Sequence, residues 1–567
     1  MRERVKGILT DRHKILNMAM LLCIAVFAFY INQGIEIKGL YMDDLYMWSC
    51  YGEQSFLEFV FPVGTSSRFR PVYWLFTYLQ MALIGPHVDR FVAFNIICNI
   101  IVAYEIFYIS GKISGLRLVA FLSSICYLAS RFAYYQIAQA LGLMETLAQF
   151  FALLIFYLLY VFMNKENERT REELIDSGEA ILKDREEKQE LALQLVRSND
   201  IYFAGALLLY VLVCFTHERY LCLLPLFYLV LLVKWLRTEK VYKKAYFRRE
   251  LGKWIAPAVT FAVIMAIRAV STGALVPAGT GGTEVTDTFS LSSMLGYVRD
   301  EILYIFGINA GQNYLSALSW AETPEIIRAI VKVSILMIGV IAAMFIIVLL
   351  LESSEKDQEG RARFLSHMAD SIYMVMFIGL CIAASSVTIR VEMRWIYVSY
   401  SASLIFAGYM VKRVTEAYGG TSSETAGLRG GKVFQAVICL VFSAYCFLSV
   451  YTNSFYRGYF GNIYFWADQL RMNSLAEETI EKYGAEGVLG KQVYILENTY
   501  GMSDFYGETF FKPYDPEKTG QGTMIHFADS IDEVPRDEVM NGEALVLMEV
   551  PEENAYRDIT DEVIEEM

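Results

Sequence analysis

Long uninterrupted apolar runs dominate this chain of 567 residues, which is 55% hydrophobic and has a mean hydropathy of +0.36. A run of about 20 apolar residues is the length that an α-helix needs to cross the core of a bilayer. The first run follows a basic segment but has no small-residue cleavage site, so we expect an uncleaved helix. The sequence therefore predicts a polytopic α-helical membrane protein.

Eleven segments satisfy the length and charge criteria for membrane spans. They lie at residues 14–32, 91–110, 117–131, 144–163, 201–216, 220–235, 254–271, 327–351, 371–389, 395–411 and 433–452. Residues 71–85 are also apolar, but this segment is short and aromatic, which favours an interfacial helix at the membrane surface.

The distribution of Lys and Arg predicts the orientation. The N-terminus and the segments 234–253 and 412–432 are strongly basic, as cytoplasmic segments usually are. These three lie on one side only if residues 71–85 do not cross the membrane. We therefore expect a multi-pass plasma-membrane protein with a cytoplasmic N-terminus and an extracytoplasmic C-terminus. Residues 164–199 would form a charged cytoplasmic helix.

The C-terminal part of the chain has a different composition. Residues 453–567 contain 24 Asp and Glu against 8 Lys and Arg, whereas residues 1–452 are mildly basic. This contrast predicts a membrane domain at 1–452 and a separate acidic extracytoplasmic domain at 453–567. Within the latter, 491–497 and 543–550 are predicted strands and 474–483 a helix, which together indicate a small α/β domain. Nothing in the composition indicates a nucleic-acid partner.

In this topology the unusual polar residues gather on the external face. Arginine side chains suit phosphate oxygens, and carboxylates with a histidine suit a divalent cation or the removal of a proton from a hydroxyl. The set therefore indicates a phosphate-bearing, membrane-bound substrate. Its members are Asp43, Asp44, Arg68, Arg70, Glu145, His217, Glu218, Arg219, Arg390, Glu392 and Arg394.

Most of these residues also have a purely structural explanation. Glu218 could pair with its neighbour Arg219, Glu145 could be a helix first-turn acid, and Arg394 could reach to the interface like other long basic side chains. Two adjacent carboxylates beside aromatic residues gain least from such an explanation. Asp43 and Asp44 are therefore the strongest functional candidates.

The order of these motifs resembles the GT-C class of integral-membrane glycosyltransferases, in particular its protein-mannosyltransferase-like members. The resemblance spans roughly residues 10–410. It is carried by Asp43-Asp44, Phe69-Arg70-Pro71-Val72-Tyr73, Gly142-Leu143-Met144-Glu145, His217-Glu218 and Met393-Arg394-Trp395-Ile396-Tyr397. The chain departs from the class where Glu145 replaces an aspartate and Leu143 an arginine.

The resemblance implies a GT-C-like fold with juxtamembrane helices in the first external loop. It also implies transfer of a sugar from a polyprenyl-phosphate-linked donor to a glycan, lipid or protein acceptor. The implied catalytic residues are Asp43, Asp44 and Glu145, and the implied substrate- and phosphate-binding residues are Arg68, Arg70, Arg390, Arg394 and Tyr397. His217 and Glu218 would bind a divalent cation such as Mg, Mn or Zn, or else the phosphate.

Two other functions fit a membrane protein of this kind. A lipid-linked glycan flippase or transporter would carry charged residues inside its spans, where this sequence has few, among them Glu105 and Arg268. A polysaccharide polymerase or ligase would be expected to carry a late external loop rich in arginine and histidine. The segment 272–326 contains no histidine. Polar groups concentrated at one surface favour the transferase.

Overall fold

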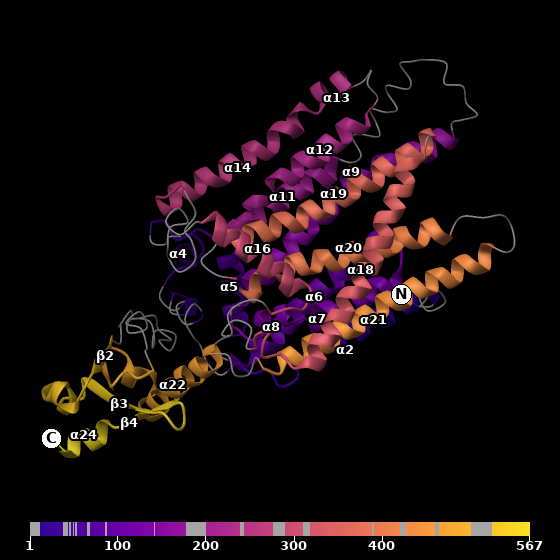
Figure 1. The fold of residues 1–567 in the computed structure, drawn as a ribbon. Helices are drawn as coiled ribbons and strands as arrows, with labels where there is room; N and C mark the ends of the chain where they lie inside the picture. The colour runs from indigo at the N-terminus through magenta and orange to yellow at the C-terminus, as the bar shows by residue number, and fades with distance from the viewer. Residues whose placement is uncertain are drawn as a thin grey trace, which may run out of the picture.

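The computed structural model is a bundle of long helices with a small sheet domain at one end (Figure 1). It describes residues 12–566 except 38–43, 45–46, 49, 52–53, 65–67, 85–87, 141, 177–199, 239–242, 276–289, 310–317, 356, 388–390, 420–426, 460–463 and 501–523.

The first half of the bundle alternates long helices with short ones. Its helices are α2 (Arg12–Ile31), α4 (Phe56–Val60), α5 (Pro71–Ile84), α6 (Val88–Ser114), α7 (Arg117–Ala129), α8 (Arg131–Ile137), α9 (Leu143–Asp176), α11 (Asp200–Thr216), the 3-10 turn η2 (Glu218–Leu223) and α12 (Leu224–Arg237).

The second half contains most of the longest helices. It comprises α13 (Lys243–Arg249), α14 (Leu251–Thr272), α16 (Leu291–Ile305), α18 (Glu325–Ser354), α19 (Gln358–Ser386), the 3-10 turn η4 (Met393–Trp395), α20 (Tyr397–Gly419) and α21 (Gly427–Arg457). The sequence did not predict α16, which lies inside the segment read as a Gly/Thr-rich external loop.

Each of the eleven predicted spans overlaps a helix or a helix with its adjoining turn. Among the described residues, eight helices are long and apolar enough to cross a membrane. Of the other three, α7 and α11 are shorter, with 13 and 17 residues, and α20 has 23 residues but contains many Ser and Tyr side chains. A polytopic helical membrane protein is therefore confirmed, while the number of eleven crossings stays a prediction.

Helix α5 is the segment that we expected at the membrane surface. Its 14 residues correspond to about 21 Å, too short for the bilayer core of about 30 Å. One face, which includes Trp74, Thr77 and Gln80, is buried, and the helix packs against α9 and α11. The segment is thus a short helix fixed to the bundle.

Burial separates central helices from peripheral ones. More than half of the apolar stretch is buried in α6 (56%) and α9 (61%), but only 11% in α2 and 17% in α21. Helices that expose most of an apolar surface suit contact with lipid tails. Most of the polar residues described below project from the central helices and from the turns that connect them.

The C-terminal domain has a four-stranded sheet in the order β2-β1-β3-β4, formed by β1 (Gln492–Leu496), β2 (Met524–Ala528), β3 (Ala544–Val550) and β4 (Ala555–Asp558). β1 is parallel to β2 and β3, and β4 is antiparallel to β3. Helix α22 (Tyr464–Val488) covers one face, and α23 (Arg536–Met540), α24 (Thr560–Glu566) and the turn η8 (Ile531–Glu533) complete the domain. The predicted strands at 491–497 and 543–550 and the helix at 474–483 are confirmed. The predicted boundary after residue 452 falls in the last turns of α21.

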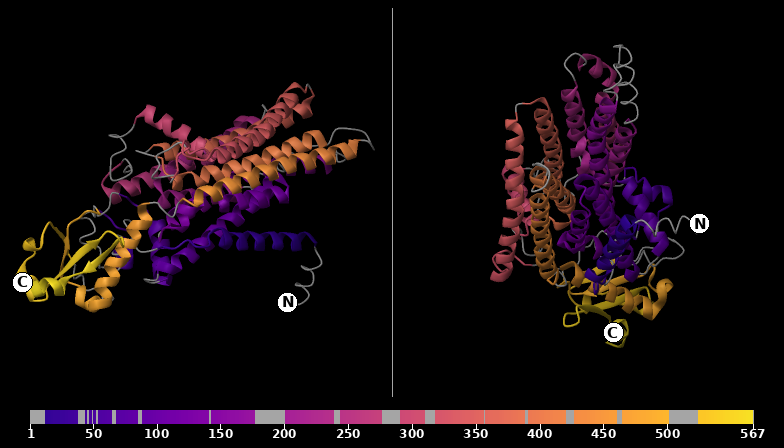
Figure 2. Two further views of the ribbon diagram at one scale, coloured as in Figure 1. Left: turned by 60° about the horizontal axis from the view of Figure 1, so that its bottom comes forward. Right: turned by 90° about the vertical axis from the view of Figure 1, so that its right-hand side faces the viewer.

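The two ends of the bundle differ. The sheet domain lies at one end, and the first residues of α2 point to the other (Figure 2). Figure 1 shows α4, α5, α8 and α16 at the same end as the sheet domain. We refer to this as the sheet-domain end. The sequence predicts that it is extracytoplasmic, and this orientation stays a prediction. Residues 177–199 of the expected cytoplasmic helix lie outside the described residues.

Candidate functional site

Asp44 lies in a short helical stretch beyond α2 and is buried, with 7% of its surface exposed. Its Oδ2 accepts a hydrogen bond of 3.1 Å from the backbone N–H of Ala140, in the turn between α8 and α9. A carboxylate buried in this way needs donors to offset its desolvation. The structure therefore joins the first loop to the turn before Glu145. Asp43, the other member of the predicted pair, lies outside the described residues.

The first turn of α9 carries the next two contacts. Glu145 is buried and forms an ion pair with Arg219, and the hydroxyl of Tyr397 donates to the same carboxylate oxygen. Met144 places its sulfur 3.1 Å from Nη1 of Arg70. Glu145 is thus an acidic residue in the first turn of a helix, as its structural explanation predicted. Its contacts also join α9 to η2 and α20.

Arg70 and Glu218 form a second buried ion pair. Nε and Nη2 of Arg70 donate to the two oxygens of Glu218 at 2.8 and 2.7 Å, and each side chain is 8% exposed. This two-bond geometry is the strongest form of arginine–carboxylate contact. The simple expectation that Glu218 pairs with its neighbour Arg219 is therefore wrong, because each of the two residues pairs with a residue far away in sequence.

Arg268 on α14 is a functional candidate that sequence reasoning did not assign to the site. It is 3% exposed, and its Nε and Nη1 have no hydrogen-bond partner among the described residues. The charges of Arg70 and Glu218 lie close enough to act on it. One turn further along α14, the carbonyl of Ser271 accepts a hydrogen bond of 2.8 Å from Gly64 of the first loop. The sequence feature that could have indicated Arg268 is its charge inside the predicted span at 254–271, where charged residues are rare.

His217 and Glu218 both make hydrogen bonds within the protein. Nδ1 of His217 accepts the backbone N–H of Arg219 at 3.3 Å, and both oxygens of Glu218 are bound by Arg70. Burial, together with the charges of Arg219 and Arg70, holds the pKa of His217 well below its usual range, so the ring is neutral. Within the described ranges no group of three or more His, Cys, Asp or Glu could hold a metal ion. A metal at these two residues therefore stays an untested prediction, and we derive no step through it.

The remaining predicted arginines differ in their surroundings. Arg68 is partly buried just before Arg70. Arg394 in η4 forms an ion pair with Glu392, and its guanidinium lies 6.0 Å from the Trp395 ring. The guanidinium of Arg219 lies 5.8 Å from the same ring. This links the η4 turn to the Glu145–Arg219 pair. Arg390 lies outside the described residues.

Glu301 on α16 is a further buried acid near the site. The hydroxyls of Ser385 and Ser386, at the end of α19, donate to its two oxygens at 2.7 and 3.3 Å. Burial raises the pKa of Glu301 to about 8, against the opposing effects of the two serines and of Arg219. Because α16 was not predicted, neither was this residue.

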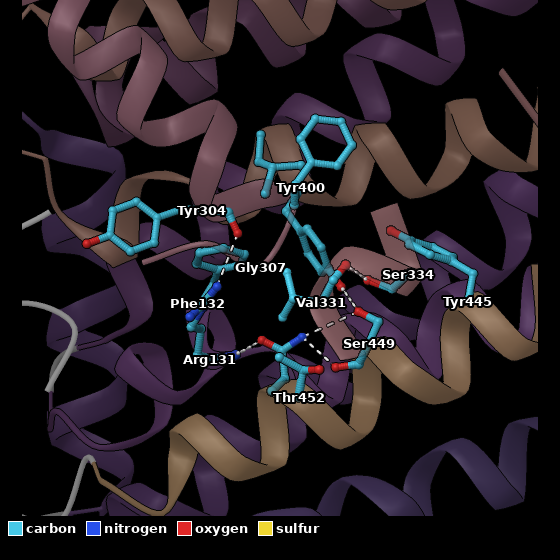
Figure 3. Close-up of a pocket in the computed structure, with 13 residues that line it drawn as sticks. Arg131, Phe132, Tyr304, Gly307, Val331, Ser334, Tyr400, Tyr445, Ser449 and Thr452 are labelled. Carbon is cyan, nitrogen blue, oxygen red and sulfur yellow. Dashed lines mark hydrogen bonds between the residues drawn. The ribbon is translucent and has the colours of Figure 1, made fainter. Parts of the chain in front are cut away.

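A second polar centre at the same end surrounds Arg131, the first residue of α8. Arg131 donates to Asn309 and, at 3.2 Å, to the carbonyl of Tyr304, and its guanidinium stacks 4.6 Å from the Tyr456 ring. Figure 3 shows the adjoining cavity, which is lined by residues of α8, α16, α18, α20 and α21. Its volume of about 10 Å³ suits one water molecule and is far too small for a sugar. We therefore interpret Arg131 as a structural tie between these helices.

Comparisons with known proteins add structural likenesses at low sequence identity. No protein-family model matches the chain, and no curated protein matches it. The chain is similar to the oligosaccharyltransferase AglB from Archaeoglobus fulgidus, solved with an inhibitory peptide and a dolichol-phosphate, at 10% identity and a TM-score of 0.47, covering 94% of this chain and 69% of that one. For an Archaeoglobus fulgidus oligosaccharyltransferase tethered to an acceptor peptide, the match covers 88% of this chain and only 63% of that chain, with 10% identity and a TM-score of 0.45.

The chain is also similar to ArnT from Cupriavidus metallidurans. The match to its apo state has 10% identity and a TM-score of 0.45, and covers 96% of this chain and 94% of that one. ArnT was also solved with undecaprenyl phosphate, where the TM-score is 0.43. Likeness at this level does not assign an activity to this chain.

Proposed function

We propose that this protein is a membrane glycosyltransferase that moves a sugar from a polyprenyl-phosphate-linked donor to an acceptor hydroxyl at the sheet-domain end of the bundle. The observation that carries the proposal is a buried carboxylate, Asp44, in the same cluster as a buried arginine, Arg268, whose Nε and Nη1 have no hydrogen-bond partner among the described residues. A base and a cation with unused hydrogen-bond donors are what a transfer from a phosphate-linked donor requires.

Contacts between residues connect the two ends of this cluster. Asp44 binds Ala140, and four residues later Met144 touches Arg70. Arg70 pairs with Glu218, and both lie close to Arg268. The cluster therefore extends from the candidate base to the candidate phosphate-binding arginine through the start of α9.

In the proposed reaction Asp44 accepts the proton of the acceptor hydroxyl while that oxygen attacks the anomeric carbon of the donor sugar. The bond between the anomeric carbon and the phosphate oxygen breaks, and its electron pair leaves with the lipid phosphate. Arg268, next to the Arg70–Glu218 pair, stabilises the negative charge that develops on the leaving phosphate. In-line attack of this kind inverts the anomeric configuration.

The other predicted residues take supporting roles in this proposal. Glu145 is held by Arg219 and Tyr397, which suits a residue that orients the acceptor. Arg68 lies two residues before Arg70 and Arg394 three residues before Tyr397, and both arginines are proposed to contact the substrate. Asp43 and Arg390 keep the roles implied by the sequence resemblance.

A direct transfer assay tests the proposal. Purified protein in nanodiscs is incubated with a panel of radiolabelled polyprenyl-phosphate sugars and candidate acceptors, with and without EDTA. We expect transfer by the wild type and a loss of at least about 100-fold in kcat for Asp44→Asn. Full activity of Asp44→Asn at normal expression would remove Asp44 as the base, and the same measurement on Asp43→Asn then decides between the two aspartates.

The same preparation separates transfer from transport. In sealed liposomes a flippase moves the labelled lipid between leaflets without forming a new glycosidic bond, whereas a transferase consumes the donor. Glu105 gives a reason to run this control, because both of its carboxylate oxygens are buried in the middle of α6 without a partner in the described part of the chain. Lipid movement without sugar transfer would contradict the proposed function.

A further inference from the structure

Two buried carboxamides lie behind the turn that contacts Asp44. Gln80 on α5 is 1% exposed and Asn95 on α6 is 2% exposed. They contact each other, with Nε2 of Gln80 3.5 Å from Oδ1 of Asn95. The sequence analysis assigned no role to either side chain, and neither has a part in the proposed reaction.

Both carboxamides donate to the backbone of the same turn. Nε2 of Gln80 donates to the carbonyl of Ala140 at 3.3 Å. Nδ2 of Asn95 donates to the carbonyls of Ile137 and Gln139 at 3.3 and 2.7 Å. Three backbone carbonyls within four residues are therefore satisfied by side chains from two other helices, where a turn would ordinarily use water.

The far side of this turn contacts the candidate base. Ala140, whose carbonyl is held by Gln80, uses its N–H to bind Asp44. Gly142 closes the turn so tightly that a Cβ there would lie 2.2 Å from the carbonyl oxygen of Gln136. The turn thus has little freedom to place the Ala140 N–H elsewhere while Gln80 and Asn95 keep their contacts.

Further hydrogen bonds connect Asn95 to the interior of the bundle. Asn99, one turn further along α6, donates to the carbonyl of Asn95 at 3.2 Å and accepts the Tyr127 hydroxyl at 2.7 Å. The amide nitrogens of Gln80, Asn95 and Asn99 are all bonded, whereas Oε1 of Gln80 is buried without a partner in the described part of the chain. Moving a bonded member would leave further groups unsatisfied in a medium of low dielectric constant.

We infer that Gln80 and Asn95 are positioning residues for the proposed glycosyl transfer, and that they fix the 137–142 turn so that the Ala140 N–H holds Asp44 in place. The inference rests on the proposed function for its catalytic meaning. It assigns the pair no contact with substrate. A carboxylate held by a backbone N–H keeps one orientation toward an incoming hydroxyl, and a misplacement of about 1 Å can cost about 100-fold in rate.

The test compares Gln80→Met with Thr77→Val on the same face of α5. Methionine retains most of the length of glutamine but cannot donate to Ala140. Thr77 is fully buried, and its hydroxyl has no partner in the described structure, so valine replaces it without loss of a hydrogen bond. Asn95→Leu is the second variant and preserves the test if Gln80→Met does not fold.

Two readouts are measured on full-length protein in nanodiscs. Amide hydrogen exchange of the peptide that covers residues 137–142 should become at least about fivefold faster in Gln80→Met and Asn95→Leu, as expected from the loss of about one hydrogen bond, and stay unchanged in Thr77→Val. With the donor that the wild type uses, kcat should fall about 10- to 100-fold in both variants, while the KM values for donor and acceptor stay within twofold.

The outcomes separate the two proposals. Unchanged exchange and unchanged kcat in Gln80→Met or Asn95→Leu, with an active wild type, overturn the positioning role alone. An equal loss of kcat in Thr77→Val points to general destabilisation and also overturns it. A wild type that transfers no sugar from any donor of the panel contradicts the proposed function, whereas the exchange measurement still decides whether the two carboxamides hold the turn.

Discussion

Replacement of Arg268 by methionine should weaken the binding of a lipid phosphate without lowering the thermal stability of the protein. Arg268 has two buried nitrogens without a described partner, whereas Arg70, close by, donates two hydrogen bonds to Glu218. Removing Arg268 takes away a buried positive charge whose Nε and Nη1 have no hydrogen-bond partner among the described residues. Removing Arg70 leaves the carboxylate of Glu218 buried without the two hydrogen bonds that now hold it. We therefore expect the two substitutions to have opposite effects on thermal stability.

The expected sizes follow from these contacts. Breaking a buried ion pair costs about 3–5 kcal/mol of stability, because one charge stays uncompensated. Arg70→Met should therefore lower the Tm by several degrees, and Arg268→Met should leave it unchanged or raise it. A charge-assisted hydrogen bond to phosphate contributes about 1.5–3 kcal/mol, which corresponds to roughly 10- to 150-fold weaker binding of a lipid phosphate to Arg268→Met.

The assay pairs differential scanning fluorimetry with binding of undecaprenyl phosphate, measured by native mass spectrometry on the same preparations. Arg299→Met is a suitable control, because this arginine is exposed and pairs only with its neighbour Asp300 among the contacts described. The reasoning is refuted if Arg268→Met binds undecaprenyl phosphate as tightly as the wild type, or if it loses as much stability as Arg70→Met.

Two further predictions concern Glu301 and Gly142. Because burial raises the pKa of Glu301 to about 8 from 4.5, the folded protein keeps a proton there that the unfolded chain releases, so stability should fall by roughly 3–5 kcal/mol as the pH rises across that window. Thermal unfolding between pH 5 and 9 should show this slope in the wild type and a flatter curve in Glu301→Gln; identical curves would contradict it. Gly142→Ala should reduce kcat at least about 10-fold, because the new Cβ would overlap the carbonyl of Gln136, whereas Gly339→Ala, with open space around it, should have no effect on transfer.

Periodicity and charge in the sequence were sufficient to predict most of the helices of the bundle. Apolar length alone placed a helix at each predicted span, and the short aromatic segment at 71–85 forms the helix α5, whose position at the membrane surface stays a prediction. The amphipathic helix α16 was missed because Gly and Thr on its N-terminal side made the whole segment resemble a loop. In the C-terminal domain, alternating residues such as Val493 and Ile495 were enough to indicate the strands.

The candidate site shows where the sequence stops being informative. Charge and adjacency correctly brought Asp44, Glu145 and Glu218 to one end, but they suggested the wrong partners. Pairing across 148 residues, as for Arg70 and Glu218, depends on which helices are neighbours, and no local pattern records that. Gln80 and Asn95 were invisible for the same reason: a buried carboxamide in an apolar run resembles an ordinary polar residue until its partners are known.

The pairing of charges is itself an argument for function. A buried ion pair contributes little net stability compared with apolar side chains of similar volume, so stability alone does not explain why Arg70–Glu218 and Arg219–Glu145 lie together at one end of the bundle. Fixed charges that need no rearrangement do favour a reaction in which charge develops on a leaving group. Each pair leaves its carboxylate neutralised and its arginine immobile. Arg268 therefore remains as a cation that a bound phosphate can contact, and Asp44, which accepts a hydrogen bond from the Ala140 N–H, remains the proposed base.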